Sequence, residues 1–282
     1  MAITNFIPEI WSAQLLSSLK KTLVFAGPGV VQRDYEGEIT QAGDTVKITS
    51  ISRPTVGTYT KNSTTINPEN LTDAQRSLLI DQSKYFAFEI DDVDLRQSAN
   101  GGALMQEAAT EAAYALADTA DQYVAGLYTG VDSGNAIGTT AITSSTLAVT
   151  NLINLVVKLD NSNVPKQGRY VIVPPWYHGL LLGSDLFARV DASGNDGTLR
   201  NGIVGRAFGL DVLVSNNCVN VTGDDWIVQA GHPSALAFAE QIVKTEAYRP
   251  ENAFSDALKG LHLYGAKLVR PTAIATLTAS IT

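Results

Sequence analysis

One stretch of the chain, from Ala103 to Tyr128, constrains the fold more than any other. Its apolar residues recur every three or four positions, which is the period of one face of an α-helix. They are Met105, Ala109, Ala112, Leu116, Ala120, Tyr123 and Leu127. Glycine pairs or single glycines mark both ends. We therefore expect one amphipathic helix about 39 Å long, roughly the diameter of a domain.

The other side of this predicted helix is acidic, because it carries Glu107, Glu111, Asp118 and Asp121. Two interpretations are open. The helix could be a core element whose acidic side simply faces solvent. Alternatively, it packs on its own domain and offers the acidic side to a partner protein.

A second informative stretch predicts a long two-stranded arm. Asp44–Ser52 alternates between apolar and polar residues, and Arg76–Ile90 is rich in aromatic and branched residues. The connection between them, Arg53–Gln75, is far longer than an ordinary hairpin loop. Because an isolated two-stranded ribbon is marginally stable in water, the arm must lie on its own body or on another subunit.

The charge of this arm is opposite to that of the whole chain. The protein has a formal net charge of −8. Between Thr45 and Pro68, however, the sequence has Lys47, Arg53 and Lys61 and no acidic residue. Chance in a short window is one explanation, and a contact with an acidic surface is the other.

The first 32 residues predict an N-terminal arm that ends in a short helix after Pro8. Apolar side chains such as Phe6 and Trp11 need a cover so close to a terminus. The arm could fold back on its own core or dock on a neighbouring subunit. Phe6 and Trp11 are therefore candidates for a subunit interface.

The remaining chain alternates predicted strands and helices, which indicates an α+β protein with an α/β middle lobe. The expected linker is Val131–Thr146, and the expected helices are Leu147–Leu159 and Trp176–Leu182. Expected strands are Arg169–Val173, Leu210–Ser215, Ile227–Ala230, Ala235–Ala239, Val243–Tyr248 and Gly260–Val269.

Composition excludes several classes of protein. No run of five basic residues is present, so tight DNA binding is not expected. A single cysteine, Cys218, excludes an intrachain disulfide and a cysteine-based metal cluster. No apolar run reaches the length of a membrane span, and the first residues lack the features of a signal peptide. We expect the protein to be made in the cytoplasm.

Motifs for catalysis are weak. His178, His232 and His262 stand in separate segments without metal-ligand spacing. Gly202–Gly209 lacks the ending of a phosphate loop and precedes a strand, so we interpret it as a turn. Adjacent acids at Asp91–Asp94 more often cap a helix than bind a cation. We expect no enzyme activity, no cofactor and no metal.

The order of these segments, with several short motifs, resembles the major capsid proteins of tailed bacteriophages, which have the Hong Kong 97-type coat fold. The motifs that carry the resemblance are FIPEIWSAQLL near the start, RDYEGEI at 33–39, GDTVKI at 43–48, LTDAQ at 71–75, IDQSKYF at 80–86, IDDVD at 90–94, GRAFGLDVLVSN at 205–216 and YGAKLV at 264–269. Each motif alone is weak, but their order covers nearly the whole chain.

The resemblance implies a coat subunit that assembles into hexamers and pentamers of an icosahedral head around double-stranded DNA. It also implies the location, the virion capsid, and the partners: other copies of the chain, a separate scaffolding protein and a portal, with no membrane. In relatives that cross-link subunits, a Lys joins an Asn of a neighbour. Lys61 lies in the corresponding loop, but nothing in the sequence identifies its partners.

The resemblance also implies a division into domains. Residues 1–32 would be the N-terminal arm, and 33–90 the extended hairpin loop that lies over an adjacent subunit. Residues 91–145 and 232–282 would form the peripheral domain with the long helix as its spine. Residues 146–231 would form the axial domain near the symmetry axes.

Two other functions compete with a viral coat. A shell protein of a bacterial nanocompartment, as in encapsulins, has the same implied fold but encloses enzymes instead of DNA. A soluble α/β enzyme would require a convergent set of titratable groups, which the sequence does not offer. For the coat, we expect the bases of the hairpin, Arg53 or Lys61, to face the acidic helix side of another subunit.

Overall fold

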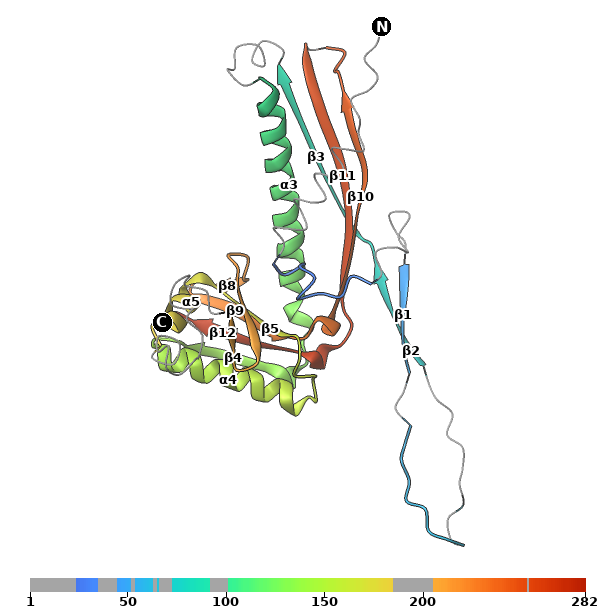
Figure 1. The fold of residues 1–282 in the computed structure, drawn as a ribbon, viewed down its shortest axis with the longest axis vertical. Helices are drawn as coiled ribbons and strands as arrows, with labels where there is room; N and C mark the ends of the chain where they lie inside the picture. The colour runs from blue at the N-terminus through green and yellow to red at the C-terminus, as the bar shows by residue number, and fades with distance from the viewer. Residues whose placement is uncertain are drawn as a thin grey trace.

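The computed structural model describes residues 24–34, 45–51, 54–62, 65, 73–91, 101–184, 205–252 and 254–282. Figure 1 shows three parts: a long helix beside a narrow sheet, a lobe built on a wider sheet at the lower end of that helix, and a hairpin that runs downward on the other side, away from both. No helix among the described residues is long and apolar enough to cross a membrane.

The long helix is present as α3, Gly101–Ala125, and it continues as the short 3-10 helix η2, Gly126–Gly130. Prediction and structure agree on its position, but the buried stripe is rotated slightly from the expected one. The expected Ala109, Leu116 and Ala120 are buried, together with Ala113 and Val124. Small side chains on this stripe let α3 lie close along the narrow sheet.

The narrow sheet is antiparallel with the strand order β10-β11-β3. Its strands are β10, Leu236–Tyr248, β11, Ser255–Leu268, and β3, Gln82–Asp91. The expected strands Ala235–Ala239 and Val243–Tyr248 are thus one strand, with an irregular register between Ile242 and Lys244. Tyr123 of α3 packs edge-on against Tyr264 of β11, with ring centroids 5.5 Å apart.

The hairpin consists of β1, Thr45–Ile51, and β2, Asp73–Leu79, which pair in antiparallel register from Thr45–Leu79 to Ile51–Asp73. The expected second strand, Arg76–Ile90, is therefore wrong in its extent. The chain leaves the hairpin at Ile80 and Asp81, and β3 then pairs with β11 instead of β1. In Figure 1 the hairpin points away from α3 and from the narrow sheet.

The base of the hairpin is fixed where it crosses the narrow sheet. Leu78 and Ile80 are buried against Ala237, Ala239 and Leu263. Gly265 of β11 lies directly beneath this crossing, and a Cβ atom on it would overlap the backbone carbonyl oxygen of Leu79. Only a glycine allows the two backbones to come this close.

We therefore expect Gly265→Val to displace the hairpin base and to destabilise the subunit by about 2 kcal/mol or more, as overpacking of a core does. Chemical denaturation followed by circular dichroism measures the loss. Gly138→Ala is the matched control, because a Cβ atom at that strand position meets nothing within 4 Å. Equal stability of the two variants would contradict the crossing described here.

The wider sheet has the strand order β4-β12-β9-β5-β7-β6, with β8 paired to β9. The bounds are β4 Ala136–Ala141, β5 Arg169–Val173, β6 Arg206–Ala207, β7 Leu210–Val214, β8 Asn220–Thr222, β9 Asp225–Gly231 and β12 Ile274–Ser280. Its helices are α4, Ser145–Asn161, and α5, Pro175–Leu182. Short 3-10 helices are η3 Ser133–Asn135, η4 Pro233–Ala235 and η5 Pro271–Ala273.

This sheet corrects the expected organisation at two places. Residues 131–146, expected to be a linker, contain strand β4. Strand β12 was not expected, and it lies between β4 and β9 in the wider sheet. The expected domain boundaries at residues 146 and 232 therefore separate β4 and β12 from β5, β7 and β9, although all five strands belong to one sheet. Polar residues in both strands, such as Thr139 and Thr276, obscure the apolar pattern that marks a strand.

The middle of the lobe follows the prediction. Strand β5 is buried at all five positions: the apolar run Tyr170–Val173 indicates a buried strand, and Arg169 pairs with Asp160 at 2.7 Å. Helix α4, expected at Leu147–Leu159, buries Leu152, Leu155 and Leu159. The hydroxyl of Tyr177 on α5 donates a 2.7 Å hydrogen bond to the backbone oxygen of Ala148 on α4, which fixes the two helices together.

Candidate assembly surfaces

The hairpin tip is an exposed surface with both apolar and basic character. All of its described residues, 54–62 and 65, are exposed. Val56 is 94% and Tyr59 is 65% exposed, and Lys61 follows them. Of the two hairpin bases proposed for an interface, Arg53 lies outside the described residues.

The acidic side of α3 is less uniform than the sequence indicates. Glu111 is exposed and Asp118 is half-buried. Asp118 accepts a hydrogen bond from Gln122, one turn later in the helix. The side chain of Glu107 lies outside those that are described, as do Phe6 and Trp11.

Asp121 does not belong to this exposed side, so the expectation for this residue is wrong. It is only 3% exposed. The reason is helical geometry: position 121 follows the buried Ala117 by four residues and lies on the same side of the helix. Asp121 therefore faces inward, where it binds parts of its own chain.

The carboxylate of Asp121 holds the N-terminal segment 24–34 onto α3. Its Oδ1 atom accepts the backbone N–H groups of Val24, Phe25 and Ala26, at 2.9, 2.6 and 3.2 Å. Three successive N–H groups that converge on one anion form the concave site known as a nest. Burial raises the pKa of Asp121, although the hydrogen bonds from Asn217 and from the backbone lower it in part.

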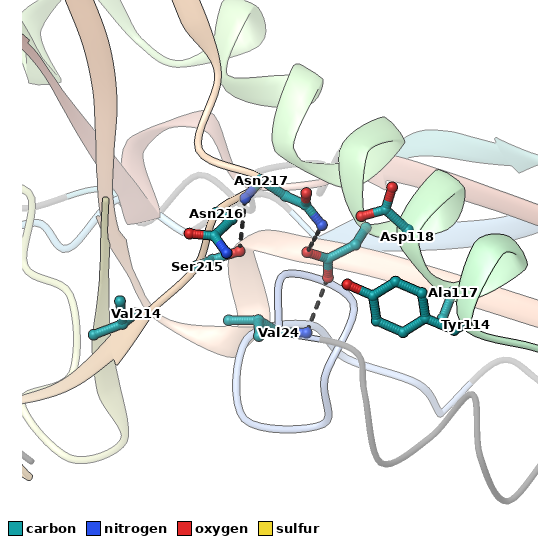
Figure 2. A pocket seen from close by; sticks show the side chains of 9 residues that line it. Val24, Tyr114, Ala117, Asp118, Val214, Ser215, Asn216 and Asn217 are labelled. Carbon is teal, nitrogen blue, oxygen red and sulfur yellow. Dashed lines mark hydrogen bonds between the residues drawn. The ribbon is translucent and has the colours of Figure 1, made fainter. Parts of the chain in front are cut away.

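The second oxygen of Asp121 binds the other lobe. Oδ2 accepts a 3.1 Å hydrogen bond from the side-chain amide of Asn217, which follows strand β7. One side chain on α3 thus joins the N-terminal segment and the end of a strand in the wider sheet. In Figure 2, dashed lines mark the hydrogen bonds that Val24 and Asn217 donate to this carboxylate.

A hollow of about 200 Å³ opens beside this junction. Figure 2 shows the side chains that line it. They come from the N-terminal segment, from α3 and from the end of β7: Val24, Tyr114, Ala117, Asp118, Asp121, Val214, Ser215, Asn216 and Asn217. Tyr114 and Val214 are apolar and partly exposed, whereas Asp118 adds a carboxylate. Among the described residues that line the hollow, none is basic.

A buried ionic cluster binds the N-terminal segment to the narrow sheet. The guanidinium of Arg33 lies 2.6 Å from Oε1 of Glu240 on β10, and it also donates to the backbone oxygen of Ala26. The Nε2 atom of His262 on β11 lies 3.4 Å from Oε2 of Glu240. The side chains of Glu240 and His262 are almost completely buried.

Two opposing effects act on the pKa of Glu240, and the partners of the carboxylate have the larger one. Burial alone raises this pKa, but the contact with His262 and the charge of Arg33 lower it below its ordinary value. The carboxylate therefore stays ionised inside the protein. Sequence reasoning missed this cluster because its members, Arg33, Glu240 and His262, lie far apart in the chain and share no motif.

Within the described residues, no group of three or more His, Cys, Asp and Glu side chains could hold a metal ion. Burial, together with the nearby Asp121 carboxylate, raises the pKa of the Cys218 thiol to about 12, so it is a poor nucleophile. The expected lack of enzyme activity stays a prediction.

Comparison with known proteins decides the family. The family model described as phage capsid protein matches residues 75–277 of the chain. The chain belongs to the phage capsid protein family. This confirms the resemblance inferred from the short sequence motifs. A search of curated proteins found no match.

Solved structures agree with this assignment. A structure from Mycobacterium phage Che8 has 33% sequence identity to this chain and a TM-score of 0.74, and the match covers 98% of both chains. The capsid of cyanophage P-SCSP1u has 17% identity and a TM-score of 0.68, with 86% of this chain and 85% of that chain covered. The Che8 structure supports the family, and the cyanophage structure, at 17% identity, supports the mixed helix and sheet fold alone.

The fold is also similar to that of nanocompartment shells. The SrpI encapsulin of Synechococcus elongatus has 10% identity and a TM-score of 0.55, with 86% of this chain and 84% of that chain covered. At this identity the likeness concerns the fold alone. The phage match is stronger in both sequence and structure, so the encapsulin interpretation has less support.

Proposed function

We propose that this chain is a major capsid protein that assembles into hexamers and pentamers of an icosahedral head, which encloses double-stranded phage DNA. The observation that carries the proposal is the 33% identity to a mycobacteriophage structure over 98% of both chains. The exposed hairpin tip supports it, because a monomer would leave those apolar side chains in water.

We further propose that the architecture is of the Hong Kong 97 type. Helix α3 would be the spine of a peripheral domain that includes the narrow sheet, and the β1–β2 hairpin would be the extended loop. The wider sheet would form the axial domain. In this proposal the axial domain includes strands β4 and β12, because they pair within the same sheet as β5, β7 and β9.

The proposed partners follow from the same architecture. Other copies of the chain would be the main partner, with a scaffolding protein and a portal during assembly in the host cytoplasm. Contact with packaged DNA would be weak and independent of sequence, because a chain of net charge −8 repels a polyanion. The proposed location of the mature protein is the virion.

Purified recombinant protein tests the proposal by sedimentation velocity and electron microscopy. We expect capsomers or closed shells, in a proportion that rises with protein concentration. A monomer at all concentrations, with cooperative unfolding that does not depend on concentration, would contradict self-assembly.

The nucleic acid content of particles isolated from infected cells distinguishes a phage head from a nanocompartment. We expect the ratio of absorbance at 260 and 280 nm to show packed DNA, and nuclease treatment of intact particles to leave it unchanged. Protein-filled particles without DNA would favour the encapsulin-like alternative, which the fold similarity to SrpI keeps open.

A further inference from the structure

The N-terminal segment 24–34 lies across the body of its own subunit without joining any of its described sheets. Its eleven residues form turns and one isolated bridge, between Gln32 and Ala237, but no helix or strand. In Figure 1 the segment, drawn in dark blue, crosses from α3 to the strands of the narrow sheet. None of the strands in the three described sheets belongs to it. These sheets therefore keep their strand pairing when the segment leaves.

Two buried carboxylates of the body hold the segment, one near each of its ends. At the first end, Asp121 of α3 accepts the backbone N–H groups of residues 24–26. At the other end, Glu240 of β10 pairs with Arg33 at 2.6 Å. Both carboxylates are almost completely buried. Hydrogen bonds to a charged group are stronger than those between neutral groups, so these two anchors dominate the polar attachment of the segment.

Hydrogen bonds within the segment hold it together as one piece. The backbone N–H groups of Val30 and Val31 both donate to the carbonyl oxygen of Gly27, at 3.0 and 3.1 Å. The Nε atom of Arg33 donates to the backbone oxygen of Ala26 at 3.1 Å. Arg33 thus binds the body and the first end of the segment at the same time. Weakening of one anchor should therefore loosen both ends together.

We propose that the N-terminal segment is a strap that opens and closes as one unit while the rest of the subunit stays folded. The closed form predominates, because it buries Phe25, Val30 and Val31. The open form is a minor state of the kind that local unfolding produces. Opening extends the reach of the chain before Val24 by up to about 36 Å, the extended length of eleven residues. This device works within one chain and goes beyond the proposed shell function.

Native-state hydrogen exchange of the full chain, resolved to single amides by mass spectrometry, tests the strap. The N–H groups of Phe25 and Ala26 report the first anchor, to which they donate. The N–H group of Phe238 on β10 reports the other end from the side of the body, because it donates to the backbone oxygen of Gln32 at 3.0 Å. After correction for intrinsic rates, we expect these amides to exchange at least about tenfold faster than those of the buried strand β5.

Two substitutions that keep the shape of the side chain test whether the ends open together. Asp121→Asn should speed exchange of the Phe238 amide, and Glu240→Gln should speed exchange of the Phe25 and Ala26 amides. Each increase should be about tenfold, as for the loss of one hydrogen bond to a charged group. In both variants, the amides of β5 should stay slower than these reporters.

The matched controls remove a carboxylate from the same two elements without touching the segment. Asp118→Asn on α3 alters a side chain that accepts a hydrogen bond from Gln122, and Glu246→Gln on β10 alters an exposed pair with Lys259. Both controls should leave the exchange of the reporters as in the wild type.

Two results would overturn the proposal. If the reporters of the wild type exchange as slowly as the amides of β5, the segment leaves only when the whole subunit unfolds. If each substitution speeds exchange only at its own end, the ends open independently and no strap exists. The first comparison uses the wild type alone, so it holds even where a variant fails to fold. Both results concern contacts within one chain and leave the proposed function as it stands.

Discussion

Replacing Asp121 by alanine should destabilise the subunit by about 2–5 kcal/mol. The carboxylate accepts the N–H groups of Val24, Phe25 and Ala26. Without it, the buried N–H groups of Phe25 and Ala26 and the partly buried one of Val24 lose this acceptor, and each unsatisfied buried group costs about 1–3 kcal/mol. Asn217 loses its partner as well. Urea unfolding at a fixed protein concentration, followed by tryptophan fluorescence, measures the change.

Asp118→Ala is the matched control, since it removes an acid one turn earlier on the same helix. Asp118 is half-buried, and its carboxylate accepts one local hydrogen bond from Gln122. Its loss should change stability by less than about 1 kcal/mol. Similar effects of the two substitutions would show that the bonds from Asp121 to the N-terminal segment contribute little to stability.

Glu240→Ala should have a comparably large effect, a loss of about 3–5 kcal/mol. The substitution removes a buried carboxylate that pairs with Arg33 at 2.6 Å and lies 3.4 Å from the buried Nε2 atom of His262, and breaking a buried ion pair by removing one partner is strongly destabilising. The control in the same strand is Glu246→Ala, which breaks the exposed pair with Lys259 and should cost at most about 1 kcal/mol.

The same residue predicts how stability depends on pH. The pKa of Glu240 is lower in the folded protein than its ordinary value, so folding favours the ionised form. This contribution is complete above the ordinary glutamate pKa, and it is lost as the pH falls through the lowered value. We expect the free energy of unfolding of the wild type to fall in this pH range because Glu240 becomes protonated. The variant Glu240→Gln should lack this part of the fall. Parallel acid-unfolding curves would contradict the assignment.

The sequence predicted those elements whose residues determine their own structure. Helix α3 and the buried strand β5 have apolar patterns that identify them without any partner. The sign reversal at the hairpin tip was also readable, because charge is a property of composition. The short motifs were sufficient for the family, which the comparison with phage capsid proteins confirms.

Features that depend on distant residues were not predictable in this way. The break between β2 and β3 at Ile80 exists because β3 pairs with β11, almost 180 residues later in the chain. The inward position of Asp121 depends on the N–H groups of a segment about 95 residues away. Neither partner is marked by local sequence. Pairing of this kind is set by tertiary structure, and it overrides the local pattern.

Strand β12 has a consequence for synthesis of the protein on the ribosome. It lies between β4 and β9 and pairs with both, although β4 precedes it by more than 130 residues. During translation, the edges of β4 and β9 that pair with β12 therefore stay unpaired until residues 274–280 have left the ribosome. Exposed strand edges are prone to aggregation. In cells that make many copies at once, chaperones should thus be needed most by unfinished chains in which β12 has not yet been synthesised.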